Sequence, residues 1–195
     1  MTRQHVLDFL LPPQCGGCDA PGTGACVRCL PLDAMSSVRL RTLDIISLGP
    51  YEGGLRRAVL ALKSGRRDVA RSFAERLCDF VAPGELLVPV PTTAARRRER
   101  GFDGCELMAA TIAQRMGITV RAGLAQIAGD RQRGRGRDAR LSARGRFAWR
   151  DAPLNGNTVT LLDDVVTTGA TLEDCAAVLR AAGAVVEKAI VVARA

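Results

Sequence analysis

Two adjacent carboxylates and a hydroxyl-rich turn stand side by side near the end of the chain. Asp163 and Asp164 follow the almost wholly apolar run 159–162, and residues 167–171 read Thr-Thr-Gly-Ala-Thr. Threonine hydroxyls and amides at the start of a helix suit a phosphate, and a glycine lets the backbone approach it closely. Two carboxylates would repel that phosphate unless ribose hydroxyls or a magnesium ion lay between them. The pattern therefore predicts a site for a ribose 5-phosphate.

Four cysteines near the start of the chain form two Cys-x2-Cys pairs separated by seven residues. Four thiolates at this spacing can surround zinc tetrahedrally, and the glycines between them permit tight turns. Such a zinc is structural, because four thiolates leave no open position for a substrate. A disulfide pair and an iron–sulfur cluster are the alternatives. The predicted metal ligands are Cys15, Cys18, Cys26 and Cys29. Cys78, Cys105 and Cys175 are predicted to be small buried hydrophobic residues.

Positive charge is concentrated in two segments. The formal net charge is +8, and residues 131–150 contain eight arginines against one acid, Asp138. Residues 96–100, Arg-Arg-Arg-Glu-Arg, form a second basic loop. Basic loops attract nucleotides, nucleic acid or anionic lipid, whereas the alternative is an ordinary solvated surface. The residues predicted to contact nucleic acid are Arg131, Arg133, Arg135 and Arg137.

The elements that must position these groups alternate between strands and helices. Apolar periodicity predicts helices over 53–63, 68–82, 103–116 and 171–182. Strands are predicted over 86–91, 118–120, 159–162 and 185–192, with one or two more before residue 50. This order is typical of an α/β fold with a parallel sheet flanked by helices. Residues 1–32 are predicted to form a short helix followed by the zinc element, and residues 33–195 the α/β domain.

Hydrophobic patterning argues against a membrane-spanning protein. No apolar run reaches the ~18 residues that a bilayer requires, and residues 1–13 are predicted to form only a short amphipathic helix ended by two prolines. The expected compartment is the cytoplasm, where thiols stay reduced.

The run 161–171, Leu-Leu-Asp-Asp-Val-Val-Thr-Thr-Gly-Ala-Thr, resembles the signature of type I phosphoribosyltransferases, which bind 5-phosphoribosyl 1-pyrophosphate (PRPP) together with magnesium. The resemblance implies that Asp163 and Asp164 hold the ribose 2′- and 3′-hydroxyls and that residues 167–171 hold the 5′-phosphate. The full set of residues implied for PRPP is Asp163, Asp164, Val165, Val166, Thr167, Thr168, Gly169, Ala170 and Thr171.

The cysteine pairs and the PRPP motif together resemble the ComF family. Residues 10–18, the block from Tyr51 to Gly65, and the block from Val88 to Asp103 are similar to segments of that family. Asp103 replaces the family's usual asparagine. Residues 131–149, which correspond to the mobile hood loop, lack its usual glutamine and spacing. The resemblance implies a role in natural competence, in which the protein handles imported single-stranded DNA beside a helicase, in the cytoplasm or peripheral to the inner face of the membrane.

An active phosphoribosyltransferase outside competence is the alternative function. In that case the resemblance implies a pyrophosphate loop after the strand at 86–91, with nearby cations neutralising the leaving group. The residues implied for pyrophosphate are Thr92, Thr93, Lys63, Arg98 and Arg100. No residue stands out as a general base for an acceptor, so the sequence leaves catalysis, the acceptor and the oligomeric state open.

Overall fold

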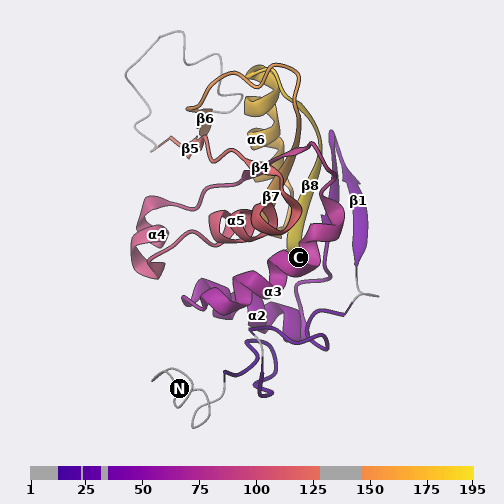
Figure 1. Ribbon diagram of the computed structural model, residues 1–195, viewed down its shortest axis with the longest axis vertical. Helices are drawn as coiled ribbons and strands as arrows, with labels where there is room; N and C mark the ends of the chain where they lie inside the picture. The colour runs from indigo at the N-terminus through magenta and orange to yellow at the C-terminus, as the bar shows by residue number, and fades with distance from the viewer. Residues whose placement is uncertain (1–12, 23, 32–34, 128–145) are drawn as a thin grey trace.

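A computed structural model describes residues 13–22, 24–31, 35–127 and 146–195. Its central sheet has six strands in the order β1-β2-β8-β7-β3-β4 (Figure 1). The strands are β1 (Ser36–Leu40), β2 (Leu43–Ser47), β3 (Leu86–Pro89), β4 (Thr119–Val120), β7 (Thr158–Val166) and β8 (Val185–Arg194). β1 pairs antiparallel with β2, and every other pairing in this sheet is parallel. The predicted α/β fold with a mostly parallel sheet is confirmed.

Helices cover both faces of the sheet and define two hydrophobic cores. The helices are α2 (Gly53–Lys63), α3 (Arg67–Leu77), the short 3-10 helix η2 (Cys78–Phe80), α4 (Ala94–Arg100), α5 (Gly104–Met116) and α6 (Ala170–Ala181). Leu162 and Val192 pack with α2, α3 and α5. Their neighbours Leu161 and Val191 pack with α6 on the opposite face. Because successive residues of a strand face opposite sides of the sheet, burial on both sides explains the consecutive apolar residues 161–162 of β7 and 189–193 of β8.

Strand β7 is longer than the sequence predicts. The apolar run ends at Leu162, but pairing with β8 continues through Val166 opposite Arg194. Asp163 and Asp164 consequently belong to the strand and do not follow it. The hydrogen bonds that β8 supplies along its length extend the strand past the point where the apolar pattern stops.

The basic segment 96–100 forms a helix and not the predicted loop. In α4 the N-cap hydroxyl of Thr93 accepts a hydrogen bond from the Arg96 amide, and Gly101 ends the helix in the left-handed conformation. None of its residues is buried, so its sequence has no apolar periodicity from which a helix could be predicted. The capping residues Thr93 and Gly101 were the available signal.

A second, two-stranded sheet lies beside the main one and was not predicted. It pairs β5 (Leu124–Gln126) antiparallel with β6 (Phe147–Trp149). Leu124 and Phe147 are buried in the core that α6 shares. The basic segment 131–150 lies outside the described residues up to residue 145, and this part includes Arg131, Arg133, Arg135 and Arg137. The helix predicted for 1–13 also falls almost wholly outside the described residues.

The four-Cys segment, residues 13–22 and 24–31, lies against α2 and α3 (Figure 1). Ala25 and Leu30 are buried and belong to the same core as Leu55 of α2 and Val69 of α3. The segment thus shares the core of the α/β body, and the boundary between residues 32 and 33 stays a prediction. None of the helices in the described ranges has the length and apolar character needed to cross a lipid bilayer.

Candidate functional site

A cavity of about 310 Å³ opens at the carboxyl end of β3 and β7. This is where open α/β sheets bind ligands. The segments that form it are the end of α2, the loop after β3, α4, the start of α5, β5, the end of β7 and the turn from β7 into α6. The residues that line it are Leu62, Lys63, Val90, Pro91, Thr92, Thr93, Arg96, Arg100, Asp103, Gly104, Cys105, Gln126, Asp163, Asp164, Val165, Thr167 and Thr171.

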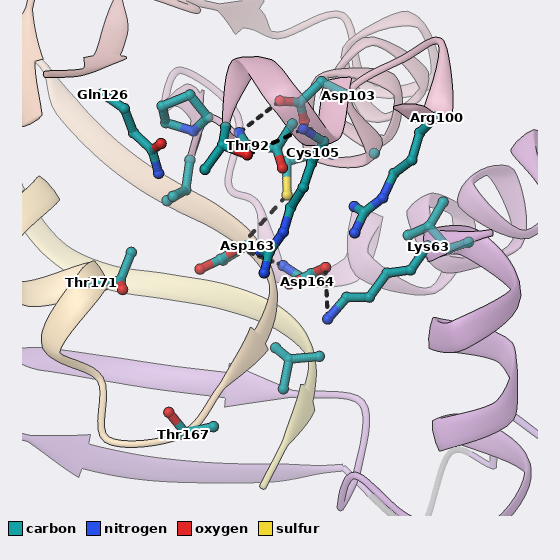
Figure 2. A pocket seen from close by; sticks show the side chains of 17 residues that line it. Lys63, Thr92, Arg100, Asp103, Cys105, Gln126, Asp163, Asp164, Thr167 and Thr171 are labelled. Atoms are coloured by element: carbon teal, nitrogen blue, oxygen red, sulfur yellow. Dashed lines mark hydrogen bonds and ion pairs between the residues drawn. The ribbon is translucent and has the colours of Figure 1, made fainter. Parts of the chain in front are cut away.

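The two predicted carboxylates stand at the centre of this cavity (Figure 2). Asp163 accepts hydrogen bonds from the Asp164 amide at 2.8 Å and from the Cys105 thiol at 3.8 Å. Burial, and then the charge of Asp164, raise the pKa of Asp163 to about 7. Burial and the nearby carboxylates also raise the pKa of Cys105, so its thiol stays protonated and able to donate.

Cations from two separate helices face the carboxylates. Lys63, the last residue of α2, lies 3.3 Å from Asp164 (Nζ to Oδ2). Arg96 and Arg100 of α4 also line the cavity, and Figure 2 shows Arg100 and Lys63 on the same side of it. Arg98 is exposed and is not part of the lining. Of the predicted pyrophosphate residues, the structure therefore brings together Lys63, Arg100, Thr92 and Thr93, but not Arg98.

The buried carboxylate of Asp103 connects the loop after β3 to the start of α5 on one side of the cavity. Asp103 is the N-cap of α5, and its Oδ1 accepts hydrogen bonds from the Cys105 and Glu106 amides at 2.9 and 3.2 Å. Its Oδ2 accepts a hydrogen bond from the Thr92 amide at 2.8 Å. The loop after β3 is thereby tied to the start of α5, and Thr92 is fixed beside the cavity.

The predicted phosphate loop joins β7 to α6. Residues 163 and 165–172 line a small hollow of about 40 Å³, and Thr167 and Thr171 also face the main cavity. Gly169, the N-cap of α6, has φ 75°, a conformation that favours glycine. A Cβ atom there would lie 2.4 Å from Leu40 Cδ1. Glycine therefore suits the left-handed turn, and a larger residue here would also force the Leu40 side chain to move.

Four polar residues that line the cavity were not predicted as site residues: Arg96, Asp103, Cys105 and Gln126. Gln126 comes from β5, on the other side of the cavity from Lys63 (Figure 2). No motif marks it, because only the β5–β6 pairing brings it to the site. Cys105 is buried as predicted, but it also contacts Asp163. Its position two residues after an aspartate that caps a helix was the one local hint.

The four predicted metal ligands do come together. The sulfur atoms of Cys15, Cys18, Cys26 and Cys29 all lie within 4.8 Å of one another. Cys15 Sγ accepts hydrogen bonds from the amides of Gly17 and Cys26 at 3.3 and 3.2 Å. Partial burial opposes ionisation of Cys26, but the Cys29 amide and the neighbouring thiols lower the pKa of Cys26 to about 6.

This arrangement fits a metal ion better than disulfides. All four cysteines are free thiols, and Cys15 and Cys29 are buried. The sulfurs of Cys18 and Cys26 are 3.5 Å apart and those of Cys15 and Cys29 are 3.7 Å apart, well beyond the ~2.05 Å of a disulfide. Four convergent sulfurs, one of which accepts two amide hydrogen bonds, match the donor set of a closed four-thiolate metal site. The cluster can therefore hold one metal ion.

Comparisons with known proteins give structural neighbours only. No protein-family model matches the chain, and no curated protein sequence matches it. Among solved structures it is similar to glutamine PRPP amidotransferase from B. subtilis, with 20% identity over 66% of this chain and 26% of that one, and a TM-score of 0.46. The chain thus spans about a quarter of the amidotransferase.

Two smaller enzymes are matched over most of their length. Orotate phosphoribosyltransferase from Aeropyrum pernix has 19% identity over 83% of this chain and 76% of that one, with a TM-score of 0.45. Adenine phosphoribosyltransferase from Thermoanaerobacter pseudethanolicus has 13% identity over 84% of this chain and 96% of that one, also with a TM-score of 0.45. Such values do not assign an activity, so the chemistry of the site must be inferred from its own residues.

Proposed function

We propose that the cavity binds PRPP. The observation that carries this proposal is the order of groups across the cavity. Asp163 and Asp164 lie between the 167–171 loop and the cations Lys63 and Arg100 (Figure 2). PRPP has the matching order of a 5′-phosphate, a 2′,3′-diol and a pyrophosphate. The cavity volume of about 310 Å³ lies at the lower end of the range for small-molecule sites.

Each part of this ligand has a chemical partner in the proposed pose. The 5′-phosphate would accept hydrogen bonds from Thr167, Thr171 and the amides at the start of α6, where the helix dipole also favours an anion. The ribose hydroxyls would donate to Asp163 and Asp164. The pyrophosphate would lie toward Lys63 and Arg100, with Thr92 close by. A magnesium ion, when bound, would neutralise pyrophosphate oxygens, and the carboxylates and phosphates supply the oxygen ligands that it prefers.

Transfer of the ribosyl group is the reaction that this pose would support. The bond between C1′ and the pyrophosphate breaks, and positive charge develops on the ribose ring while negative charge grows on the leaving group. Lys63 and Arg100 would stabilise the growing negative charge, and the carboxylates would hold the ring in place. An acceptor would approach from the side of Gln126, whose amide can both donate and accept hydrogen bonds.

Calorimetric titration with Mg-PRPP tests the proposal. Zinc-loaded wild-type protein is expected to show saturable binding. The double variant Asp163→Asn with Asp164→Asn should lose that binding while its thermal unfolding stays cooperative. Asp79→Asn is the matched control, because Asp79 is exposed in η2 and lies outside the cavity lining. Undiminished affinity in the double variant would contradict the ribose assignment.

The proposed metal in the four-Cys cluster is a structural zinc ion. Thiolates select zinc over magnesium or calcium, and four of them leave no position for a substrate. Support comes from the convergence of the four sulfurs and from the amide hydrogen bonds to Cys15. Zinc in this position would stabilise the packing of the four-Cys segment.

A role in DNA uptake is the cellular function that we propose on the basis of the ComF resemblance. One structural observation favours contact with a polyanion: α4 has no buried residue and exposes three of its arginines, Arg96, Arg97 and Arg98. The protein would then act in the cytoplasm or at the inner face of the membrane, beside a helicase. Binding of a short single-stranded DNA should weaken steeply between 50 and 200 mM salt, by about tenfold or more. A DNA affinity that does not change with salt concentration would contradict the proposal.

A further inference from the structure

Helix α2 connects the metal cluster to the ligand cavity. Near its start, Gly54 lies against the cluster: a Cβ atom on Gly54 would be 2.7 Å from Cys29 Sγ. A Cβ atom on Gly17 would be 2.6 Å from the Gly54 carbonyl oxygen. Two glycines therefore permit direct contact between the backbone of α2 and the cysteine cluster, and no solvent layer separates them.

Polar contacts hold the same two parts together. The Arg57 guanidinium of α2 donates from Nε to the carbonyl of Gly17, which lies between Cys15 and Cys18. Arg66, just beyond the helix, donates to the carbonyl of Gln14. Charge-assisted hydrogen bonds of this kind are among the stronger ones in proteins. Because both acceptors flank metal ligands, the conformation of the four-Cys segment and the position of α2 depend on each other.

The other end of α2 reaches the cavity. Leu62 and Lys63, its last two residues, both line the cavity. Lys63 lies 3.3 Å from Asp164, and Figure 2 shows its side chain extending from the helix toward that carboxylate. A helix of this length spans about 15 Å and moves as a rigid rod. A shift or tilt at Gly54 and Arg57 therefore displaces Lys63 relative to Asp164.

We infer that the metal-loaded four-Cys segment positions Lys63 for the anionic ligand, and that Arg57 is the positioning residue that transmits this effect. The inference rests on the proposed PRPP function. It implies that metal and PRPP bind cooperatively, although the two sites share no ligand atom. By linkage, whatever factor zinc contributes to PRPP affinity, PRPP must contribute to zinc affinity.

Two neighbouring arginines of α2 provide a matched test. Arg56 and Arg57 are both exposed, but Arg56 stacks on Tyr51 at 5.8 Å, whereas Arg57 contacts Gly17. In zinc-loaded protein, Arg57→Ala is expected to weaken Mg-PRPP binding by about fivefold or more, with one zinc still bound per chain. Arg56→Ala should bind as the wild type does, and Arg57→Lys, which retains a cationic donor, should recover part of the loss.

Zinc retention supplies a readout that does not depend on activity. Saturating Mg-PRPP should slow the transfer of zinc from the wild-type protein to a chelator, and this protection should shrink in Arg57→Ala. Lys63→Met should bind PRPP more weakly but should no longer respond to Arg57→Ala, because the transmitting contact is gone.

The possible outcomes separate the inference from the function on which it rests. The coupling would be overturned, and the proposed function left intact, if Arg57→Ala and Arg56→Ala bound PRPP with equal affinity. The same conclusion would follow if PRPP did not change the rate of zinc transfer to the chelator. Zinc-loaded wild-type protein that does not bind PRPP would overturn both.

Discussion

The Asp103 carboxylate bridges the loop after β3 and the first turn of α5, since it accepts hydrogen bonds from Thr92 at 2.8 Å and from Cys105 at 2.9 Å. It is 4% exposed. Asp103→Ala leaves these amides without their acceptor and is expected to lower the free energy of unfolding by about 2–3 kcal/mol. Urea denaturation measures this loss.

Asp103→Asn distinguishes the two halves of that bridge. The asparagine oxygen can still cap α5, but its NH2 group cannot accept from Thr92. The stability loss should therefore be smaller than for Asp103→Ala, by about 1 kcal/mol. Equal losses in the two variants would show that the Thr92 contact, and not the helix cap, dominates.

The raised pKa of Asp163 predicts a pH-dependent stability. Since the native state holds this proton up to about pH 7 and the unfolded chain releases it near pH 4, stability falls as pH rises between those values and stays low above them. Asp163→Asn removes the penalty. Its unfolding temperature relative to wild type should therefore increase from pH 5 to pH 8. An unchanged or decreasing difference would show that Asp163 ionises without cost in the native state.

Replacing Gly169 is expected to lower stability for two separable reasons. Gly169→Ala places a Cβ atom 2.4 Å from Leu40 at a φ of 75°, whereas Gly156→Ala has a φ of 79° with nothing within 4 Å. Gly156→Ala should cost about 1 kcal/mol from backbone strain alone. Gly169→Ala should cost more and should also weaken PRPP binding.

A double-variant cycle checks the packing part of that prediction. Leu40→Ala creates space for the new methyl group, so Gly169→Ala should cost less in the Leu40→Ala background than in wild type. Strict additivity of the two losses, measured by urea denaturation, would show that the contact with Leu40 is not the source.

The cysteine cluster predicts one zinc ion per chain. Metal analysis of the purified protein should find about one equivalent, and removal by a chelator should lower the unfolding temperature, because the buried sulfurs then face one another without a cation. Cys26→Ser should reduce the bound zinc in the same analysis. Well under one equivalent in wild-type protein would contradict the site.

Local pattern alone predicted the motifs and most of the elements. The predicted helix 53–63 matches α2, and Gly104–Met116 begins one residue after the predicted start. Helices of this kind can be predicted from sequence because the spacing of their apolar residues reflects the face that each helix buries. The four cysteines and the run from Asp163 to Thr171 were also recognisable, since each set lies within a short stretch of chain.

Only the tertiary structure decided which distant residues complete the site. Lys63 and Asp164 are about one hundred residues apart in the chain, and the close approach of α2 and β7 makes them an ion pair. Gln126 and Cys105 reach the cavity in the same way. The extra length of β7 depends on β8, and α4 depends on its caps rather than on burial. Hydrogen bonds and contacts between distant segments produce no periodic pattern in the sequence. Burial of one face of a helix or strand does produce such a pattern, because apolar residues then recur at a fixed spacing.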